Sequence, residues 1–144
     1  MTEIAEHVLL IAESWIGTPY RHQASLKGVG CDCLGLVRGI WRELYGYEPE
    51  RPPPYAPDWA ERSGEDRLMD AALRHFGSPL SPAEALPGDL LLFRWRPQLA
   101  AKHAGILSAE RQFIHAYEQA AVIASPLVPS WRRRIAAVFR FPEK

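Results

Sequence analysis

Apolar side chains recur every three or four residues in three segments of the chain, a spacing that lines one face of a helix. The clearest of these segments predicts a helix over Cys33–Tyr45. Asp32 is a favourable N-terminal cap for this helix, and Gly46 is a favourable stop. Its apolar face would consist of Leu34, Val37, Trp41 and Leu44. The same period predicts two further helices, over residues 4–15 and 67–76.

After residue 89 the pattern changes to short apolar runs separated by polar turn residues, which predicts β-strands. The predicted strands are residues 90–95, 103–107, 113–117, 121–125 and 135–141. Helices followed by strands indicate an α+β fold with a mostly antiparallel sheet of five to six strands. We expect the helix that begins at Cys33 to pack on that sheet.

Between these regions, the proline-rich stretch Arg51–Pro57 can form neither a helix nor a central strand. It is expected to be an extended surface connector, with a partner-binding polyproline segment as the alternative. The basic run Arg132–Arg134 is interpreted as a solvated surface or a docking patch. Four tryptophans are expected to anchor the core or an interface rather than to stack on sugars: Trp41, Trp59, Trp95 and Trp131.

Composition is consistent with one domain spanning residues 1–144. The 144 residues are 47% hydrophobic, and a chain of this size can bury about 70% of its unfolded surface. Seventeen basic and seventeen acidic side chains cancel, which argues against direct nucleic-acid binding driven by phosphate neutralisation. No stretch reaches the ~18 apolar residues of a membrane span. Thr2–Glu6 carries acids where an export signal carries lysines, so we expect synthesis in the cytoplasm without a signal peptide.

Cys33 is the first candidate for chemistry. It would occupy the first turn of its helix, where unpaired backbone N–H groups and the helix dipole stabilise a thiolate. A thiolate is a nucleophile, whereas a neutral thiol is not. The alternative is that Cys33 is a small buried packing residue, which is a common fate of free cysteines.

Two histidines in the second half supply the groups that a cysteine nucleophile needs. His103 and His115 lie in consecutive predicted strands. A hairpin centred on Ala109 would place them directly opposite each other on one face of the sheet. His103 could then take the proton from Cys33 while His115 orients the imidazole. Alternatively, each histidine is a hydrogen-bonded core or surface residue.

The two cysteines, Cys31 and Cys33, are separated by one residue. A disulfide between them would close a small strained ring, so two thiols are expected. Together with His103 and His115 they could supply four zinc ligands. Structural zinc sites usually separate their cysteines by two to four residues, however, so the one-residue spacing argues against zinc. We expect no cofactor.

Five short segments occur in a fixed order along the chain: Trp15–Tyr20, Asp32–Val37, Pro87–Leu90, His103–Ile106 and Phe113–Ala116. Together they resemble the NlpC/P60 family of papain-like cysteine peptidases, which cut peptidoglycan stem peptides. The resemblance covers residues 15–141, nearly the whole chain. Two stretches, Gly17–Ser25 and Cys31–Val37, most resemble small stand-alone members encoded with phage tails and tail-like gene transfer agents.

The resemblance implies a papain-like NlpC/P60 fold and a role for each matching residue. Cys33 would be the nucleophile, with its own backbone N–H as one oxyanion donor. His103 would be the general base, and His115 the third, orienting residue. Tyr20 matches a family tyrosine near the oxyanion and the substrate. Asp32 matches an acidic residue that meets a free amino group of the stem peptide.

The chain departs from the family pattern at two places. Leu34 stands where most relatives have serine, and the segment Arg21–Gly30 replaces paired glycines. With these departures, the sequence still predicts a cysteine endopeptidase acting on peptidoglycan stem peptides. A phage-like tail would carry it, in contact with tail-tip or hub proteins, to help penetrate the cell wall during DNA delivery from a virion-like particle. The alternatives are a structural tail-tip component with a weakened site and an acyltransferase that uses the same residues.

Overall fold

The computed structural model describes residues 1–55, 66–109 and 111–144. It begins with helix α1 (Glu3–Ser14), where the Thr2 side chain accepts the Ala5 N–H at 3.1 Å. Two short strands, β1 (Ser25–Leu26) and β2 (Gly30–Cys31), pair antiparallel and lead into helix α2 (Cys33–Tyr45). This two-stranded sheet was not predicted from the sequence.

Helix α2 has the predicted bounds, and both predicted caps are confirmed. Asp32 Oδ1 accepts the Gly35 N–H at 2.7 Å, which satisfies one of the free donors of the first turn. Gly46 ends the helix with a φ of 85°, a left-handed conformation that glycine adopts without strain.

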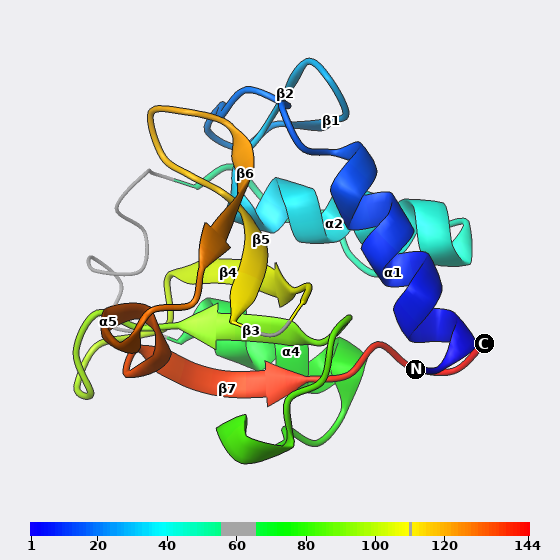
Figure 1. The fold of residues 1–144 in the computed structure, drawn as a ribbon. Coiled ribbons are helices and arrows are strands. Elements are labelled where there is room, and N and C mark those ends of the chain that lie inside the picture. The colour runs from blue at the N-terminus through cyan, green and yellow to red at the C-terminus, as the bar shows by residue number, and fades with distance from the viewer. Residues whose placement is uncertain (56–65, 110) are drawn as a thin grey trace.

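The remaining elements form one further helix layer and a sheet (Figure 1). Helix α4 (Arg67–Phe76) and a short 3-10 helix, η1 (Pro82–Glu84), precede the sheet. The strands are β3 (Leu90–Phe93), β4 (His103–Leu107), β5 (Gln112–Ala116), β6 (Val122–Pro126) and β7 (Ile135–Phe139). Their order is β6-β5-β4-β3-β7, and each neighbouring pair is antiparallel. The α+β fold with a five-stranded sheet is therefore confirmed, while the short helix α5 (Pro129–Arg132) was not predicted.

The two faces of the sheet are covered by different material because side chains alternate along a strand. One face packs against α1 and α2 and contributes Leu90, Leu92, Ile106 and Ile114 to the main buried cluster. The opposite face contributes Leu91, Phe93, Leu107, Phe113 and Val138 to a second cluster, which Trp131 of α5 partly covers. His103 lies on this second face, since it pairs with Phe93 in the β3–β4 ladder.

Helices α1 and α2 cross closely, as Figure 1 shows. Trp15, at the end of α1, lies over Gly39 of α2, where an added Cβ would be only 2.1 Å from a ring atom of Trp15. The Trp15 Nε1–H also donates to Glu43 at 2.6 Å. A glycine at position 39 is therefore required for the helices to approach this closely. Their contact positions α2, and with it Cys33 at the start of that helix.

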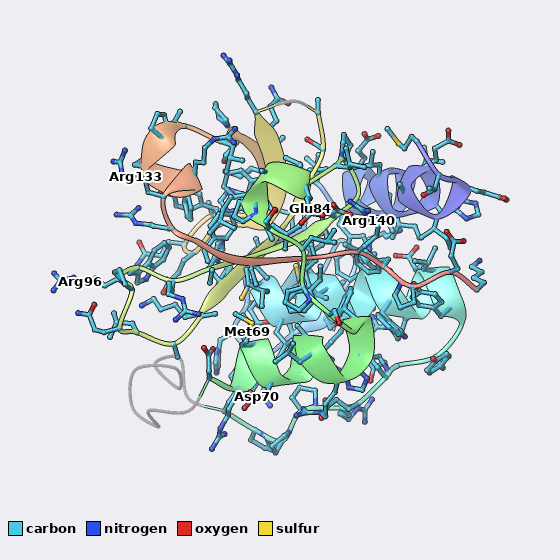
Figure 2. The ribbon with its side chains drawn as sticks, turned by 90° about the horizontal axis from the view of Figure 1, so that it is seen from below. Met69, Asp70, Glu84, Arg96, Arg133 and Arg140 are labelled. Carbon is cyan, nitrogen blue, oxygen red and sulfur yellow. The ribbon has the colours of Figure 1, made fainter. Side chains whose placement is uncertain are left out.

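The far end of α2 is tied to the C-terminal segment. The Tyr45 hydroxyl donates to the Pro142 carbonyl at 2.7 Å, and the two chain ends lie near each other in Figure 1. Elsewhere, Arg140 donates to both carboxylate oxygens of the buried Asp89 at 3.0 and 2.9 Å. It also donates to the Glu84 carbonyl at 3.2 Å, which joins β7 to η1 (Figure 2).

Residues 51–55 form no regular secondary structure, in agreement with the predicted extended connector. The rest of that predicted loop, residues 56–57, and Trp59 lie outside the described residues. Trp41 is buried in the main cluster, as expected. In the part of the chain that the structure describes, no helix combines the length and the apolar character needed to cross a bilayer.

Candidate active site

The start of α2 places Cys33 against the first residues of β4. Its Sγ lies 3.8 Å from the Lys102 carbonyl oxygen. The backbone N–H groups of Ala104 and Leu34 hydrogen-bond to the sulfur. The thiol is therefore held by the residues on either side of His103, at the junction of the helix and the sheet. It is half-buried, whereas Cys31 on β2 is fully buried.

His103 and His115 meet, but in a register different from the predicted one. Ile106 pairs with Ile114 and Leu107 with Phe113. His115 therefore lies across from Gly105, and the prediction that it directly faces His103 is wrong. The hairpin closes later than expected because the Ser108 N–H bonds to the Gln112 carbonyl at 3.1 Å. Both histidines nevertheless lie on the same face.

Gly105 makes the diagonal contact between the histidines possible. His103 Nε2 and His115 Nδ1 are 2.8 Å apart. A Cβ at position 105 would lie 3.1 Å from the His115 Cβ and 2.9 Å from a ring atom of Phe113. With no side chain between them, the two imidazoles can approach to hydrogen-bonding distance across the ladder.

Ser125 is the third member of a hydrogen-bonded chain that begins with His103 and His115, and it was not predicted from the sequence. His115 Nε2 lies 2.8 Å from the Ser125 Oγ on the neighbouring strand β6. His115 is fully buried, and both of its ring nitrogens are engaged. No motif marks Ser125 in the sequence. Only the β5–β6 register, in which His115 pairs with Ile123 and Phe113 with Ser125, brings it near the histidine.

Aromatic rings enclose the histidine pair. Trp95 stacks on His103 with ring centroids 6.2 Å apart and an interplanar angle of 22°. Trp131 lies 5.6 Å from the His103 ring and 5.5 Å from the His115 ring. Phe113 contacts His115 at 4.1 Å. These rings exclude water from the pair, which strengthens its hydrogen bonds and disfavours positive charge on either imidazole.

The ionisation of the site follows from this burial. Burial, and then the charge of Asp32, raise the pKa of Cys33 to about 12, although the Ala104 and Leu34 N–H groups act in the opposite direction. Burial, with the charges of His115 and Lys102, lowers the pKa of His103 to about 3. Burial lowers the pKa of His115 to about 4. The prediction of a stabilised thiolate is therefore wrong for the substrate-free protein, in which all three groups are neutral at pH 7.

Tyr20 lies near Cys33. Burial raises the pKa of its hydroxyl, and the nearby Cys33 and Asp32 raise it further. Backbone bonds fix its position: the Tyr20 N–H donates to the Ala120 carbonyl at 3.0 Å, and the Cys31 N–H to the Pro19 carbonyl at 3.0 Å. The tyrosine is thus held between β2 and the segment that precedes β6.

Asp32 is buried, and partners from the protein itself occupy its oxygens. Besides capping α2, it accepts the Gln23 N–H at 2.7 Å and the Tyr55 hydroxyl on Oδ2. Tyr55 comes from the proline-rich connector and is held there by a 2.6 Å contact between its carbonyl and His22 Nε2. For Asp32 to receive a substrate amino group, the Tyr55 hydroxyl has to move away. No motif in the sequence marks Tyr55, because its contact with Asp32 joins two segments that are distant along the chain.

The possible zinc site does not form among the described residues. Within residues 1–55, 66–109 and 111–144, no group of three or more His, Cys, Asp or Glu side chains is arranged to hold a metal ion. Both cysteines are free thiols, which confirms that they are not joined in a disulfide.

Comparison with known proteins places this geometry in a family. The model of the NlpC/P60 family matches residues 17–140. The chain belongs to the NlpC/P60 family. It is 32% identical over 121 residues to murein DD-endopeptidase MepS/murein LD-carboxypeptidase of Escherichia coli K12, covering 83% of this chain and 54% of that protein. It is 29% identical over 131 residues to gamma-DL-glutamyl hydrolase of Bacillus subtilis, covering 90% of this chain and 28% of that protein.

The chain thus corresponds to only part of each of these relatives. Solved structures share its fold. The NlpC/p60 domain of the peptidoglycan hydrolase SagA aligns with a TM-score of 0.65 and 21% identity, covering 95% of this chain and 98% of that one. RipD of Mycobacterium tuberculosis aligns with a TM-score of 0.61 and 16% identity, covering 97% and 98%. RipD is described as a non-catalytic NlpC/p60 domain protein adapted to peptidoglycan binding.

Proposed function

We propose that the protein is a cysteine endopeptidase that hydrolyses peptide bonds in peptidoglycan stem peptides. The observation that carries this proposal is the arrangement around His103. The Cys33 thiol is held by the residues flanking His103, and His103 is hydrogen-bonded to His115. Membership of the NlpC/P60 family supports it, as do the endopeptidase and hydrolase names of the relatives.

The histidine–histidine–serine chain determines which nitrogen of His103 is free to act as a base. If His103 Nε2–H donates to His115 Nδ1, then His115 Nε2–H donates to the Ser125 Oγ, and His103 Nδ1 carries a lone pair. If both bonds run the other way, Nδ1 carries a proton and His103 cannot accept one. Ser125, as an acceptor, therefore favours the basic tautomer of His103.

In the proposed reaction, His103 Nδ1 takes the thiol proton as the Cys33 sulfur attacks the scissile carbonyl carbon. The tetrahedral intermediate collapses to a thioester, and the imidazolium gives its proton to the leaving amine. Water, deprotonated by His103, then attacks the thioester and restores the thiol. Because both groups are neutral at rest, the thiol proton must move to His103 as the sulfur attacks, rather than before the substrate binds.

Two further groups are assigned roles in substrate binding. The Cys33 backbone N–H, at the start of α2, would donate to the oxyanion, and the nearby Tyr20 hydroxyl would lie beside it. Asp32 would receive a free amino group of the stem peptide after the Tyr55 hydroxyl has moved from its Oδ2. A cationic amine offers Asp32 a charge-assisted hydrogen bond in place of a neutral one.

For delivery, we propose that a phage-like tail carries the protein to the cell wall, in contact with tail-tip or hub proteins. The resemblance of Gly17–Ser25 and Cys31–Val37 to tail-encoded members supports this role. The protein should co-purify with intact particles, and particles carrying Cys33→Ala should assemble normally yet deliver DNA poorly. Normal delivery by such particles would leave only a structural role in the tail.

The enzymatic proposal is tested with purified protein and muropeptides. We expect cleavage products that contain a new amino terminus and that are absent with Cys33→Ala. Products joined to an added amine instead of water would indicate acyl transfer by the same site. The masses of the products therefore distinguish hydrolysis from acyl transfer in one experiment.

A second candidate is a non-catalytic component that binds peptidoglycan or serves as a structural tail part. The raised pKa of Cys33 and the occupied carboxylate of Asp32 favour it, because both oppose turnover. RipD, a non-catalytic NlpC/p60 domain protein adapted to peptidoglycan binding, is a precedent for a domain of this fold without catalysis. Binding of muropeptides by wild type and Cys33→Ala with equal affinity, and cleavage by neither, would support this candidate.

A further inference from the structure

A cavity of about 370 Å³ lies between α2 and α4, next to the candidate active site. Its volume falls within the range of roughly 300–1,000 Å³ that small-molecule sites occupy. Leu34 and Ala104, whose backbone N–H groups contact the Cys33 sulfur, form part of its wall. Figure 2 shows α4 lying alongside α2, and Asp70 of α4 is among the residues that line the cavity. The cavity and the thiol therefore share two neighbouring residues, Leu34 and Ala104.

Apolar side chains make up most of the wall. They come from both helices, from strand β3 and from the proline-rich connector: Val37, Leu68, Ala72, Leu90, Leu92 and Pro53. A ligand in this space would thus need an apolar body to replace the water that it displaces.

Within the part of the chain that the structure describes, two buried donors on α2 belong to residues of this wall and lack a hydrogen-bond partner. Trp41 is 5% exposed, and its Nε1 makes no hydrogen bond. Arg38 has a side chain that is 11% exposed, and its Nε likewise makes none. Both residues line the cavity, one helical turn apart. Because buried donors are rarely left unpaired, these two atoms indicate a missing acceptor.

The charge around Arg38 favours an anionic acceptor. Glu48 accepts from Arg38 Nη2 at 3.0 Å and from Arg42 Nη1 at 2.5 Å, and its Oε2 lies 3.8 Å from Arg51 Nε. One carboxylate therefore faces three guanidinium groups. Burial alone would raise the pKa of Glu48, but Arg42 and Arg38 lower it, so Glu48 is ionised and already engaged. Glu50, on the cavity wall, is likewise engaged by Arg74 and His75 at 2.7 and 2.8 Å.

We propose that this cavity binds an aliphatic carboxylate. The chain would fill the apolar space, and the carboxylate would accept from the Arg38 Nε–H and the Trp41 Nε1–H. Two sources share this chemistry: a free aliphatic acid, or a long side chain of the stem peptide that ends in a carboxylate. The second source rests on the proposed function, whereas binding itself does not.

The test uses nuclear magnetic resonance of the indole N–H groups in the Cys33→Ala variant of this chain, which lacks the proposed nucleophile. The chain contains five tryptophans, and the signal of Trp41 is assigned by its loss in Trp41→Phe. Titration with hexanoate should shift the Trp41 signal saturably, with at least a tenfold lower Kd than acetate. Hexylamine has the same chain and the opposite charge, and it should bind at least tenfold more weakly than hexanoate.

Two variants locate the ligand. Ala72→Leu should fill the cavity and abolish the response, and Arg38→Met should remove the preference for hexanoate over hexylamine. The remaining indole signals report whether each variant is folded. If Ala72→Leu is unfolded, Leu68→Phe serves as the second filling variant. No response of Trp41 to millimolar hexanoate, or equal responses to hexanoate and hexylamine, would overturn the proposal.

A stem tripeptide then distinguishes the two sources. A tripeptide whose third residue is a diamino acid ending in a carboxylate should shift the same signal and compete with hexanoate, if the substrate supplies the ligand. Matched binding of a tripeptide ending in lysine would exclude that source. Because no step requires hydrolysis, failure of the proposed peptidase activity leaves the outcome of this experiment intact.

Discussion

The two faces of the central sheet are built from the same strands but have different chemistry. The face toward α1 and α2 is mainly apolar, with Ile106 and Ile114 almost fully buried. The opposite face of the same two strands carries His103 and His115 among aromatic rings. Because side chains alternate along a strand, the two candidate catalytic histidines lie on one face, while their neighbours in sequence pack against the helices on the other.

This difference between the two faces explains how a small domain can contain a strongly polar candidate active site. Polar groups on the histidine face satisfy one another through short hydrogen bonds, so their burial does not leave unpaired donors. Packing against the helices supplies most of the stabilisation from the other side. Substitutions on the two faces should consequently separate activity from stability.

The largest expected effect is the loss of the base. His103→Ala should lower kcat by at least about 10⁴-fold, because no other group in the site can take the thiol proton. The unfolding midpoint should change little. Steady-state kinetics on a muropeptide, together with denaturant unfolding, measure both quantities. Retention of one tenth of the wild-type rate would exclude His103 as the base.

The next largest effect concerns the partner of that base. His115→Ala should lower kcat by about 10²- to 10⁴-fold, since water can partly replace an orienting group. His115→Asn retains a hydrogen-bonding side chain and should recover part of the rate. If His115→Ala were silent, the 2.8 Å contact between the imidazoles would have no role in turnover.

On the helix-facing side, Ile106→Ala should act in the opposite manner. Removing this fully buried side chain should lower the free energy of unfolding by about 2–5 kcal/mol. The kcat of the folded fraction should stay within a factor of about two, because the histidines project from the other face. A large fall in kcat at an unchanged unfolding free energy would contradict the division between the faces.

The resting state of the nucleophile is tested by alkylation. With a pKa of about 12, Cys33 is protonated at neutral pH, so its iodoacetamide rate should rise about tenfold per pH unit between pH 7 and 9. Cys31 should react more slowly throughout, since it is fully buried. Mass spectrometry of the alkylated peptides resolves the two sites. A rate for Cys33 that levels off near pH 7 would instead indicate a thiolate in the free protein.

The smallest expected effect belongs to Ser125. Ser125→Ala removes the hydroxyl that hydrogen-bonds to His115 Nε2 and should lower kcat by about tenfold, or about 1.4 kcal/mol. Ser125→Thr keeps the hydroxyl and should restore most of the rate. The KM should be unchanged in both variants, because Ser125 acts through the two histidines. A loss in KM alone would assign Ser125 to substrate binding.

Local patterns were enough to predict most of the fold. Helix α2 was predicted to the residue because both of its ends are set locally, by the Asp32 cap and by Gly46. The bounds of β4 were also predicted, since an apolar run ends at Ser108. The small β1–β2 sheet escaped prediction because two-residue strands contain too few positions to show alternation.

The site was predicted less completely, for reasons of distance and burial. The register of the hairpin that carries His103 and His115 depends on the geometry of its turn. The number of residues between the two strands does not determine that register. Ser125 and Tyr55 reach the site from other segments of the chain, and no spacing rule connects them to it. The expectation of a thiolate rested on the helix dipole and left out desolvation. In the folded protein, burial has the largest effect on the pKa of Cys33.

The bond between Tyr45 and Pro142 has an architectural consequence. It holds the end of the chain at the opposite end of α2 from Cys33, and the beginning of the chain lies nearby. A module with adjacent termini can be spliced into a larger polypeptide as a cassette, entering and leaving through one side. In such a cassette, both connections would lie on the opposite side of the domain from Cys33.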